Sequence, residues 1–364
     1  MTDDMLPRDE AVQLIAPDGT LIADAEYPLP HPVALLAAYR SLVEGRRIND
    51  QASALVRQGR LAVYPSSHGQ EACQVAAARV LDGAEDWLFP TYRDSVAIIG
   101  RGVSPAETMV LLQGDWHSGY DVRAHRVAPQ STPLATQLLH AVGLAYAARR
   151  RGDDTVALAL CGDGATSEGD FHEALNFAAV FRVPVVFFVQ NNGFAISVPL
   201  ARQTAAPSLA HKAIGYGMPG ERVDGNDVAA LLSVLGAAVD RARDGGGPSL
   251  IEAHTYRMQA HTNADDDTRY RERAEVQAWM HRDPLLRLRA YLRGTGALDD
   301  AHEAEFSAGA DRIAADLRDA LNADAELDPR DLFRFVTAMP SPQRDEQWGM
   351  LRDELERDDT GAPR

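Results

Sequence analysis

Residues 155–194 read TVALALCGDGATSEGDFHEALNFAAVFRVPVVFFVQNNGF, and this stretch decides the fold. Its two continuous apolar runs, TVALALC (155–161) and VPVVFFVQ (183–190), have the composition of strands that are buried on both faces of a sheet. The residues between them, 170–181, favour a helix. A buried strand, a helix and a second buried strand predict a parallel βαβ unit.

The segments on both sides extend this unit into an α/β domain. The spacing of apolar residues predicts helices near 35–43, 69–80 and 231–239 and a further strand over 248–257. Residues 1–32 are rich in proline and aspartate, which predicts an arm lying over a surface. We therefore expect an α/β fold with a parallel sheet flanked by helices over 33–295, and a helical C-terminal region with a charged tail over 296–364.

Two polar segments directly follow the two buried strands. Gly162, Asp163 and Gly164 come after the first, and Asn191 and Asn192 come after the second. Because the carboxyl ends of parallel strands meet at one edge of the sheet, both segments can share one ligand site. Glycines let backbone amides approach a phosphate, and carboxylate and amide oxygens suit Mg²⁺. The sequence thus predicts a metal-bridged diphosphate pocket, although each segment alone could also be an ordinary turn.

Composition excludes several classes of protein. The 364 residues carry 36 basic and 53 acidic side chains, a net charge of −17, which disfavours binding to nucleic acid or to a membrane surface. The two cysteines, Cys73 and Cys161, are far apart and form no zinc or disulfide pattern. The N-terminal residues show no targeting signal, so we expect a cytoplasmic protein.

The motifs in and around 155–194 resemble the alpha subunit of the decarboxylating component of the 2-oxo acid dehydrogenases. The similarity extends, in order, through FPTYRDS (89–95), STPLATQ (131–137), RVDGNDV (222–228), TYRMQAHTNADDDTRYR (255–271) and DPLLRLRAYL (283–292). It implies the thiamin diphosphate-binding fold, with thiamin diphosphate and Mg²⁺ as cofactors.

The resemblance assigns residues to the cofactor. It implies that Mg²⁺ is held by Asp163, the Asn192 side chain and the Phe194 carbonyl. The other implied contacts to thiamin diphosphate are Tyr92, Arg93, Thr132, Leu134, Gly162, Gly164, Ala165 and His261. In branched-chain relatives the pattern at 131–137 also binds potassium, which would use Ser131, Pro133, Thr136 and Gln137; a plain helix start is the alternative.

The resemblance also points to histidines. It implies that His261, on a polar segment after a predicted strand, contacts the diphosphate and the reacting species, either stabilising an oxyanion or moving a proton. His117 matches the region of a second catalytic histidine, and His125 competes with it for that role. Two interpretations of His68 stay open, an ordinary helix start and a position facing the substrate.

The implied activity is oxidative decarboxylation of a 2-oxo acid with transfer of the acyl group to a lipoyl domain of the acyltransferase component. The implied assembly has two alpha and two beta subunits, with a glutamate of the beta subunit activating the cofactor. The segment STPLATQ favours a branched-chain acid such as 2-oxoisovalerate over pyruvate. Two alternatives from other classes stay open: a Mg²⁺-dependent phosphate-ester or nucleotide-binding α/β enzyme, and a non-catalytic scaffold with a relic site.

Overall fold

The structure is a computed structural model that describes residues 5–82, 84–114, 119–323, 328–334 and 336–359. The chain divides into two compact units, Met1–Ala320 and Leu321–Arg364. The domain boundary that the sequence predicts at residue 296 stays a prediction. The division between the two compact units lies further along the chain, after Ala320. No helix in the described part of the chain is long and apolar enough to cross a membrane.

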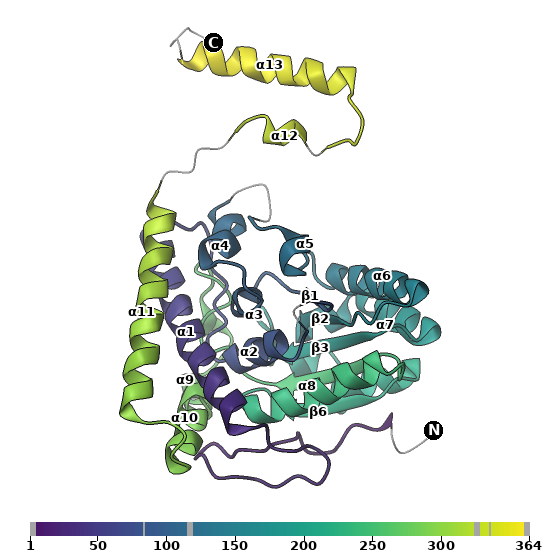
Figure 1. Ribbon diagram of the computed structural model, residues 1–364, viewed down its shortest axis with the longest axis vertical. Helices are drawn as coiled ribbons and strands as arrows, with labels where there is room; N and C mark the ends of the chain where they lie inside the picture. Colours follow the sequence, from purple (N-terminus) through teal and green to yellow (C-terminus); the bar gives the residue numbers. More distant parts are fainter. Residues whose placement is uncertain (1–4, 83, 115–118, 324–327, 335, 360–364) are drawn as a thin grey trace. The chain divides into compact units, whose positions relative to one another are not determined.

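A parallel five-stranded sheet lies at the centre of the first unit (Figure 1). Its order is β1-β2-β3-β7-β6, and every neighbouring pair is parallel. The strands are β1 (Trp87–Phe89), β2 (Ala157–Gly162), β3 (Val185–Asn191), β7 (Ser249–His254) and β6 (Gly220–Asp224). The predicted βαβ unit is confirmed, because β2 and β3 are neighbours joined through helix α7 (Gly169–Phe181). The α/β class with a parallel sheet is confirmed with it.

Side chains alternate across the two faces of this sheet. In β2, Leu158 and Leu160 belong to one buried cluster, and Ala157, Ala159 and Cys161 belong to the other. Both faces are therefore covered, which explains why the strand sequences are continuously apolar.

Helices supply the covering layers. The second cluster packs α6 (Thr136–Arg151) and α7 against one face, and the two helices lie side by side (Figure 1). The first cluster packs α1 (Pro32–Arg57), α2 (Glu71–Arg79), α3 (Ser95–Gly100), α8 (Val228–Arg243) and α10 (Pro284–Gly294) on the other side. The unit also contains α4 (Pro105–Gln113), α5 (Val122–His125), α9 (Arg273–Met280), the short strands β4 (Phe194–Ala195) and β5 (Val198–Pro199), and the 3₁₀ helices η2 (Asp163–Ser167), η3 (Leu200–Arg202), η4 (Ala210–Tyr216) and η5 (Asp267–Arg269).

The N-terminal segment is inserted into the domain more deeply than an arm over a surface. Val12 forms a parallel bridge to Val223 of β6, and Leu14 and Ile15 are only 1% exposed. Arg287 of α10 donates to the Ile15 carbonyl at 2.7 Å and lies 2.9 Å from Asp224. The segment is thus held at the edge of the sheet by buried polar contacts.

The C-terminal region is helical, as the sequence predicts. It contains α11 (Asp300–Asn322), α12 (Asp331–Arg334) and α13 (Pro342–Asp359). The charged residues after Pro342 form the last of these helices, so the part of the tail that the structure describes has regular secondary structure.

Candidate active site

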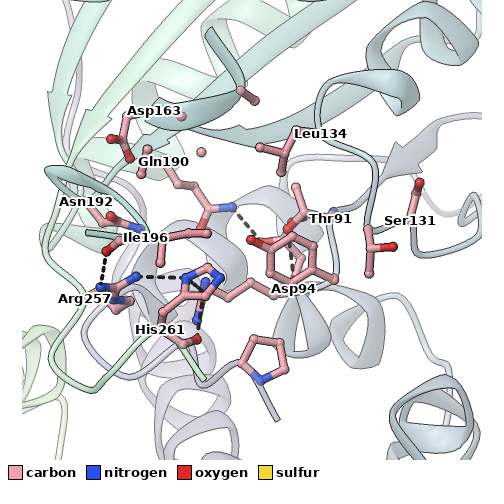
Figure 2. Close-up of a pocket in the computed structure, with 18 of the residues that line it drawn as sticks. Thr91, Asp94, Ser131, Leu134, Asp163, Gln190, Asn192, Ile196, Arg257 and His261 are labelled. Atoms are coloured by element: carbon pink, nitrogen blue, oxygen red, sulfur yellow. Dashed lines mark hydrogen bonds between the residues drawn. The ribbon is translucent and has the colours of Figure 1, made fainter. Parts of the chain in front are cut away.

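A cavity of about 530 Å³ opens at the carboxyl ends of β2 and β3 (Figure 2). The sequence-predicted residues that line it are Tyr92, Arg93, Ser131, Thr132, Pro133, Leu134, Gln137, Gly162, Asp163, Gly164, Ala165, Asn192, Phe194 and His261. Thr136 does not line it, and its hydroxyl donates to Asp170 at 3.3 Å. His117 lies outside the described residues. The structure thus brings together segments that are more than 150 residues apart in the sequence.

Asp163 lies at the first position of η2, directly after β2 ends. Its carboxylate is buried, with 1% exposure, and this burial raises its pKa. Gln203 donates to it at 2.6 Å, and a hydrogen bond from the Asn192 backbone opposes the rise in pKa. Among the described residues it forms no ion pair with lysine or arginine. Asp163 is therefore a buried carboxyl group whose ionised form a cation in the cavity would stabilise.

His261 lies between two arginines. Its Nδ1 atom is 2.9 Å from Nη2 of Arg93 and 3.0 Å from Nη1 of Arg257. A guanidinium can only donate, so Nδ1 must accept and the ring proton must lie on Nε2. Burial, together with the charges of Arg93 and Arg257, lowers the pKa of His261 to about 4. His261 is therefore a neutral hydrogen-bond donor near neutral pH.

A second group of side chains fixes the segment that carries His261. The His261 backbone N–H donates to Asp265 at 2.8 Å, and the Tyr270 hydroxyl donates to the same carboxylate oxygen at 2.5 Å. Arg257 donates to the Tyr270 oxygen at 2.7 Å and to the Ile196 carbonyl at 3.0 Å. The sequence motif at 255–271 does not identify Asp265, Tyr270 or Arg257 as partners of His261, because their roles depend on how the loop folds back.

The start of α6 supplies the opposite side of the cavity, where Figure 2 places Ser131 and Leu134. Ala135, its N-cap residue, has a left-handed backbone with φ of 65°. Gln137 donates to the Leu160 carbonyl at 2.7 Å, and its Oε1 atom is buried and has no hydrogen-bond partner among the residues that the structure describes. This oxygen is a free acceptor beside the cavity.

Two further histidines lie away from the cavity. His125, at the end of α5, lines a separate cavity with Arg79 and Arg101. The Nδ1 atom of His68 lies 3.0 Å from Nε2 of Gln259. Neither lines the cavity that contains His261, and the choice between His117 and His125 as the second histidine stays a prediction.

Comparison with known proteins decides the family. Residues 39–329 match the family described as the dehydrogenase E1 component. The chain belongs to this family.

Relatives of this E1 chain match it over most of its length. The alpha subunit of 3-methyl-2-oxobutanoate dehydrogenase from Mycobacterium tuberculosis is 49% identical over 351 residues, which cover 96% of this chain and 95% of that protein. The 2-oxoisovalerate dehydrogenase subunit alpha of Bacillus subtilis is 40% identical over 73% of this chain and 83% of the relative. The pyruvate dehydrogenase E1 component subunit alpha of Staphylococcus aureus is 37% identical over 88% of this chain and 85% of that protein. The predicted resemblance and the oxidoreductase class are confirmed.

The E1 family implies thiamin diphosphate, and the cavity fits a diphosphate. Arg93 and Arg257 are 7% and 1% exposed, and neither forms an ion pair with a carboxylate in the described part of the chain. Buried charges need a partner, and an anion in the cavity would provide one. A Cβ atom at Gly164 would lie 2.8 Å from the Cβ of Ala195, so the backbone there passes where a side chain could not. The donor set is that of a phosphate site.

Proposed function

We propose that the chain is the alpha subunit of a thiamin diphosphate-dependent dehydrogenase that decarboxylates a branched-chain 2-oxo acid and passes the acyl group to a lipoyl domain. The observation that carries the proposal is the joint placement of Asp163, Asn192, Arg93 and His261 on one cavity of an E1-family chain. Two alpha and two beta subunits would form the enzyme, and the beta subunit would provide the glutamate that activates the cofactor.

The chain's own residues would hold the diphosphate and its metal. The Asp163 carboxylate, the Asn192 amide oxygen and the Phe194 carbonyl offer the hard oxygen ligands that Mg²⁺ prefers. Backbone amides at Gly162, Gly164 and Ala165 follow the end of β2, where they can donate to phosphate oxygens.

The remaining contacts to the cofactor would come from the two sides of the cavity. Arg93 and Tyr92 lie at the His261 side, with the Tyr92 ring edge-on to the imidazole at 6.2 Å between centroids. Thr132 and Leu134 lie at the opposite side, before α6.

Thiamin diphosphate, when bound, would supply a carbon nucleophile and an electron sink for the decarboxylation. His261 would stabilise negative charge on the substrate oxygen through its Nε2–H. A neutral imidazole held by two arginines suits this task better than proton abstraction, because Nδ1 is already occupied and the basicity of the ring is low.

The acyl end of the substrate would face the apolar part of the cavity wall. Val63, Pro65, Leu112, Leu134 and Ile196 contribute to it. Relatives that are named for branched-chain substrates match at 49% and 40% identity, and those named for pyruvate match at 37%. Both observations support a branched-chain acid.

A potassium ion would bind at the start of α6. The unpaired Oε1 atom of Gln137 is a ready ligand, and Ser131 and the Pro133 carbonyl lie in the same loop. Thr136 is engaged with Asp170 and would have to turn to join them.

Calorimetric titration of thiamin diphosphate with Mg²⁺ into the co-purified alpha and beta subunits tests the proposal. We expect binding by the wild-type complex and a loss of at least ~100-fold in affinity for Asp163→Asn, which removes the only anionic ligand of the proposed metal set. An absence of binding to the wild-type complex would overturn the proposal. Binding of a nucleotide in place of the cofactor would favour the phosphate-ester alternative.

A further inference from the structure

A row of buried amides leads from the proposed metal position to a carboxylate. Nδ2 of Asn192 donates to Oε1 of Gln70 at 3.1 Å, and Nε2 of Gln70 donates to Oε1 of Gln190 at 3.5 Å, a long contact. Nε2 of Gln190 donates to Oδ1 of Asp94 at 2.7 Å, the contact drawn between these residues in Figure 2. Each of the four residues is at most 6% exposed.

Asp94 gives the row its direction. Its other oxygen accepts from the Thr91 backbone N–H at 2.7 Å and from the Thr91 hydroxyl at 2.6 Å. A carboxylate surrounded by donors can only accept, so Gln190 must present its NH₂ group to it. The Gln190 oxygen must then accept from Gln70, and the Gln70 oxygen must accept from Asn192.

The direction of the hydrogen bonds in this row determines which side-chain atom of Asn192 can face a ligand. With its NH₂ group directed to Gln70, Asn192 has Oδ1 as the side-chain atom that it can offer to a cation. The Phe194 backbone N–H also donates to this Oδ1, at 3.2 Å, and so supports the same orientation. An amide turned the other way would present two hydrogens to the metal.

We infer that Asp94 is a positioning residue that acts through Gln190 and Gln70 to keep Oδ1 of Asn192 turned toward the metal. The inference rests on the proposed function, because it takes Asn192 as a ligand of Mg²⁺.

The substitution Asp94→Asn tests this role with little change in shape. The introduced amide can donate to Gln190 as well as accept from it, so the reversed row, with Oδ1 of Asn192 accepting from Gln70, becomes possible. Substitutions of groups that orient metal ligands typically cost about 10- to 100-fold in metal affinity, and we expect a loss of at least ~10-fold. Gln70→Met interrupts the row without touching Asp94, and we expect the same loss.

The experiment measures Mn²⁺ binding by electron paramagnetic resonance, using the alpha and beta subunits with saturating thiamin diphosphate. The control is Asp86→Asn, which removes another fully buried carboxylate, paired with Arg243 at 2.6 Å and outside the cavity. This control is expected to lower the melting temperature and leave Mn²⁺ affinity unchanged. High Mn²⁺ is expected to restore kcat in Asp94→Asn and Gln70→Met, which a general loss of folding would not allow.

The possible outcomes separate the two proposals. Mn²⁺ binding by the wild-type complex with unchanged affinity in both Asp94→Asn and Gln70→Met would overturn the positioning role and leave the proposed function intact. If Asp94→Asn does not fold, Gln70→Met alone decides. An absence of Mn²⁺ binding by the wild-type complex would overturn the proposed function and the positioning role together.

Discussion

Replacing Arg257 by glutamine is predicted to return His261 toward an ordinary histidine. With a pKa of about 4 in place of 6.5, His261 is protonated in about 0.3% of molecules at pH 6.5, where an unperturbed histidine is half protonated. Arg257 contributes one of the two charges at about 3 Å from Nδ1. A charge at such a distance shifts a pKa by roughly 1 to 3 units. Burial and Arg93 are the larger causes and remain in the variant, so Arg257→Gln should produce only the lower part of this shift and raise the pKa of His261 to between about 5 and 6.

The assay is the pH dependence of kcat/KM for 2-oxo acid oxidation by the alpha and beta subunits, with an artificial electron acceptor. We expect no inflection from His261 above pH 5 in the wild-type enzyme and an acid limb near pH 5 to 6 in Arg257→Gln. Arg257→Lys keeps the charge and loses the contact to Ile196, and it should retain the wild-type profile at a lower rate. A wild-type inflection near pH 6.5 that disappears in His261→Asn would refute the assignment of a neutral His261.

Further predictions concern the backbone at Gly164, the buried ion pair of Arg287 and the cavity lined by His125. Gly164→Ala places a Cβ 2.8 Å from that of Ala195. A cost of about 1 to 3 kcal/mol in the cofactor complex predicts that calorimetry will show thiamin diphosphate binding weakened by about 5- to 150-fold. Unchanged affinity would show that the loop adjusts without cost. Arg287→Met leaves the buried carboxylate of Asp224 unpaired and should lower the free energy of unfolding by about 3 to 5 kcal/mol in urea titrations; a loss below 1 kcal/mol would argue against the buried ion pair. His125→Asn should change kcat/KM by less than about twofold, because this residue does not line the cavity, and a large loss would return it to the list of catalytic candidates.

The fold could be predicted where sequence pattern and burial coincide. The runs that became β2 and β3 are apolar at every position because both faces of these strands are covered. Strands β1 and β6 were not predicted. β1 has only three residues, and the sequence of β6, GERVD, is too polar to indicate a buried strand. Their places are set by pairing with longer neighbours at the two edges of the sheet, which no local pattern reports.

The residues of the candidate site also fall into two groups, those that the sequence predicts and those that it does not. Glycines and carboxylates that follow buried strands are visible in the sequence, because the topology of parallel sheets brings strand ends together. Asp94 and Gln70 carry no such signal, since their roles arise from side-chain contacts that span 96 to 122 positions of the chain. Arg257 shows the limit most clearly: it lies four residues before His261 yet contacts that ring only because the segment folds back.

The most direct test of the proposed function compares 3-methyl-2-oxobutanoate with pyruvate as substrates for the co-purified alpha and beta subunits, with thiamin diphosphate, Mg²⁺ and an artificial electron acceptor. One methylene in an apolar pocket is worth about 1 to 3 kcal/mol, so a branched-chain enzyme should favour the larger acid by at least ~10-fold in kcat/KM. Turnover that depends on thiamin diphosphate and shows this preference is the predicted result. Preference for pyruvate would contradict the assigned substrate, and absence of turnover with either acid would contradict the proposed function itself.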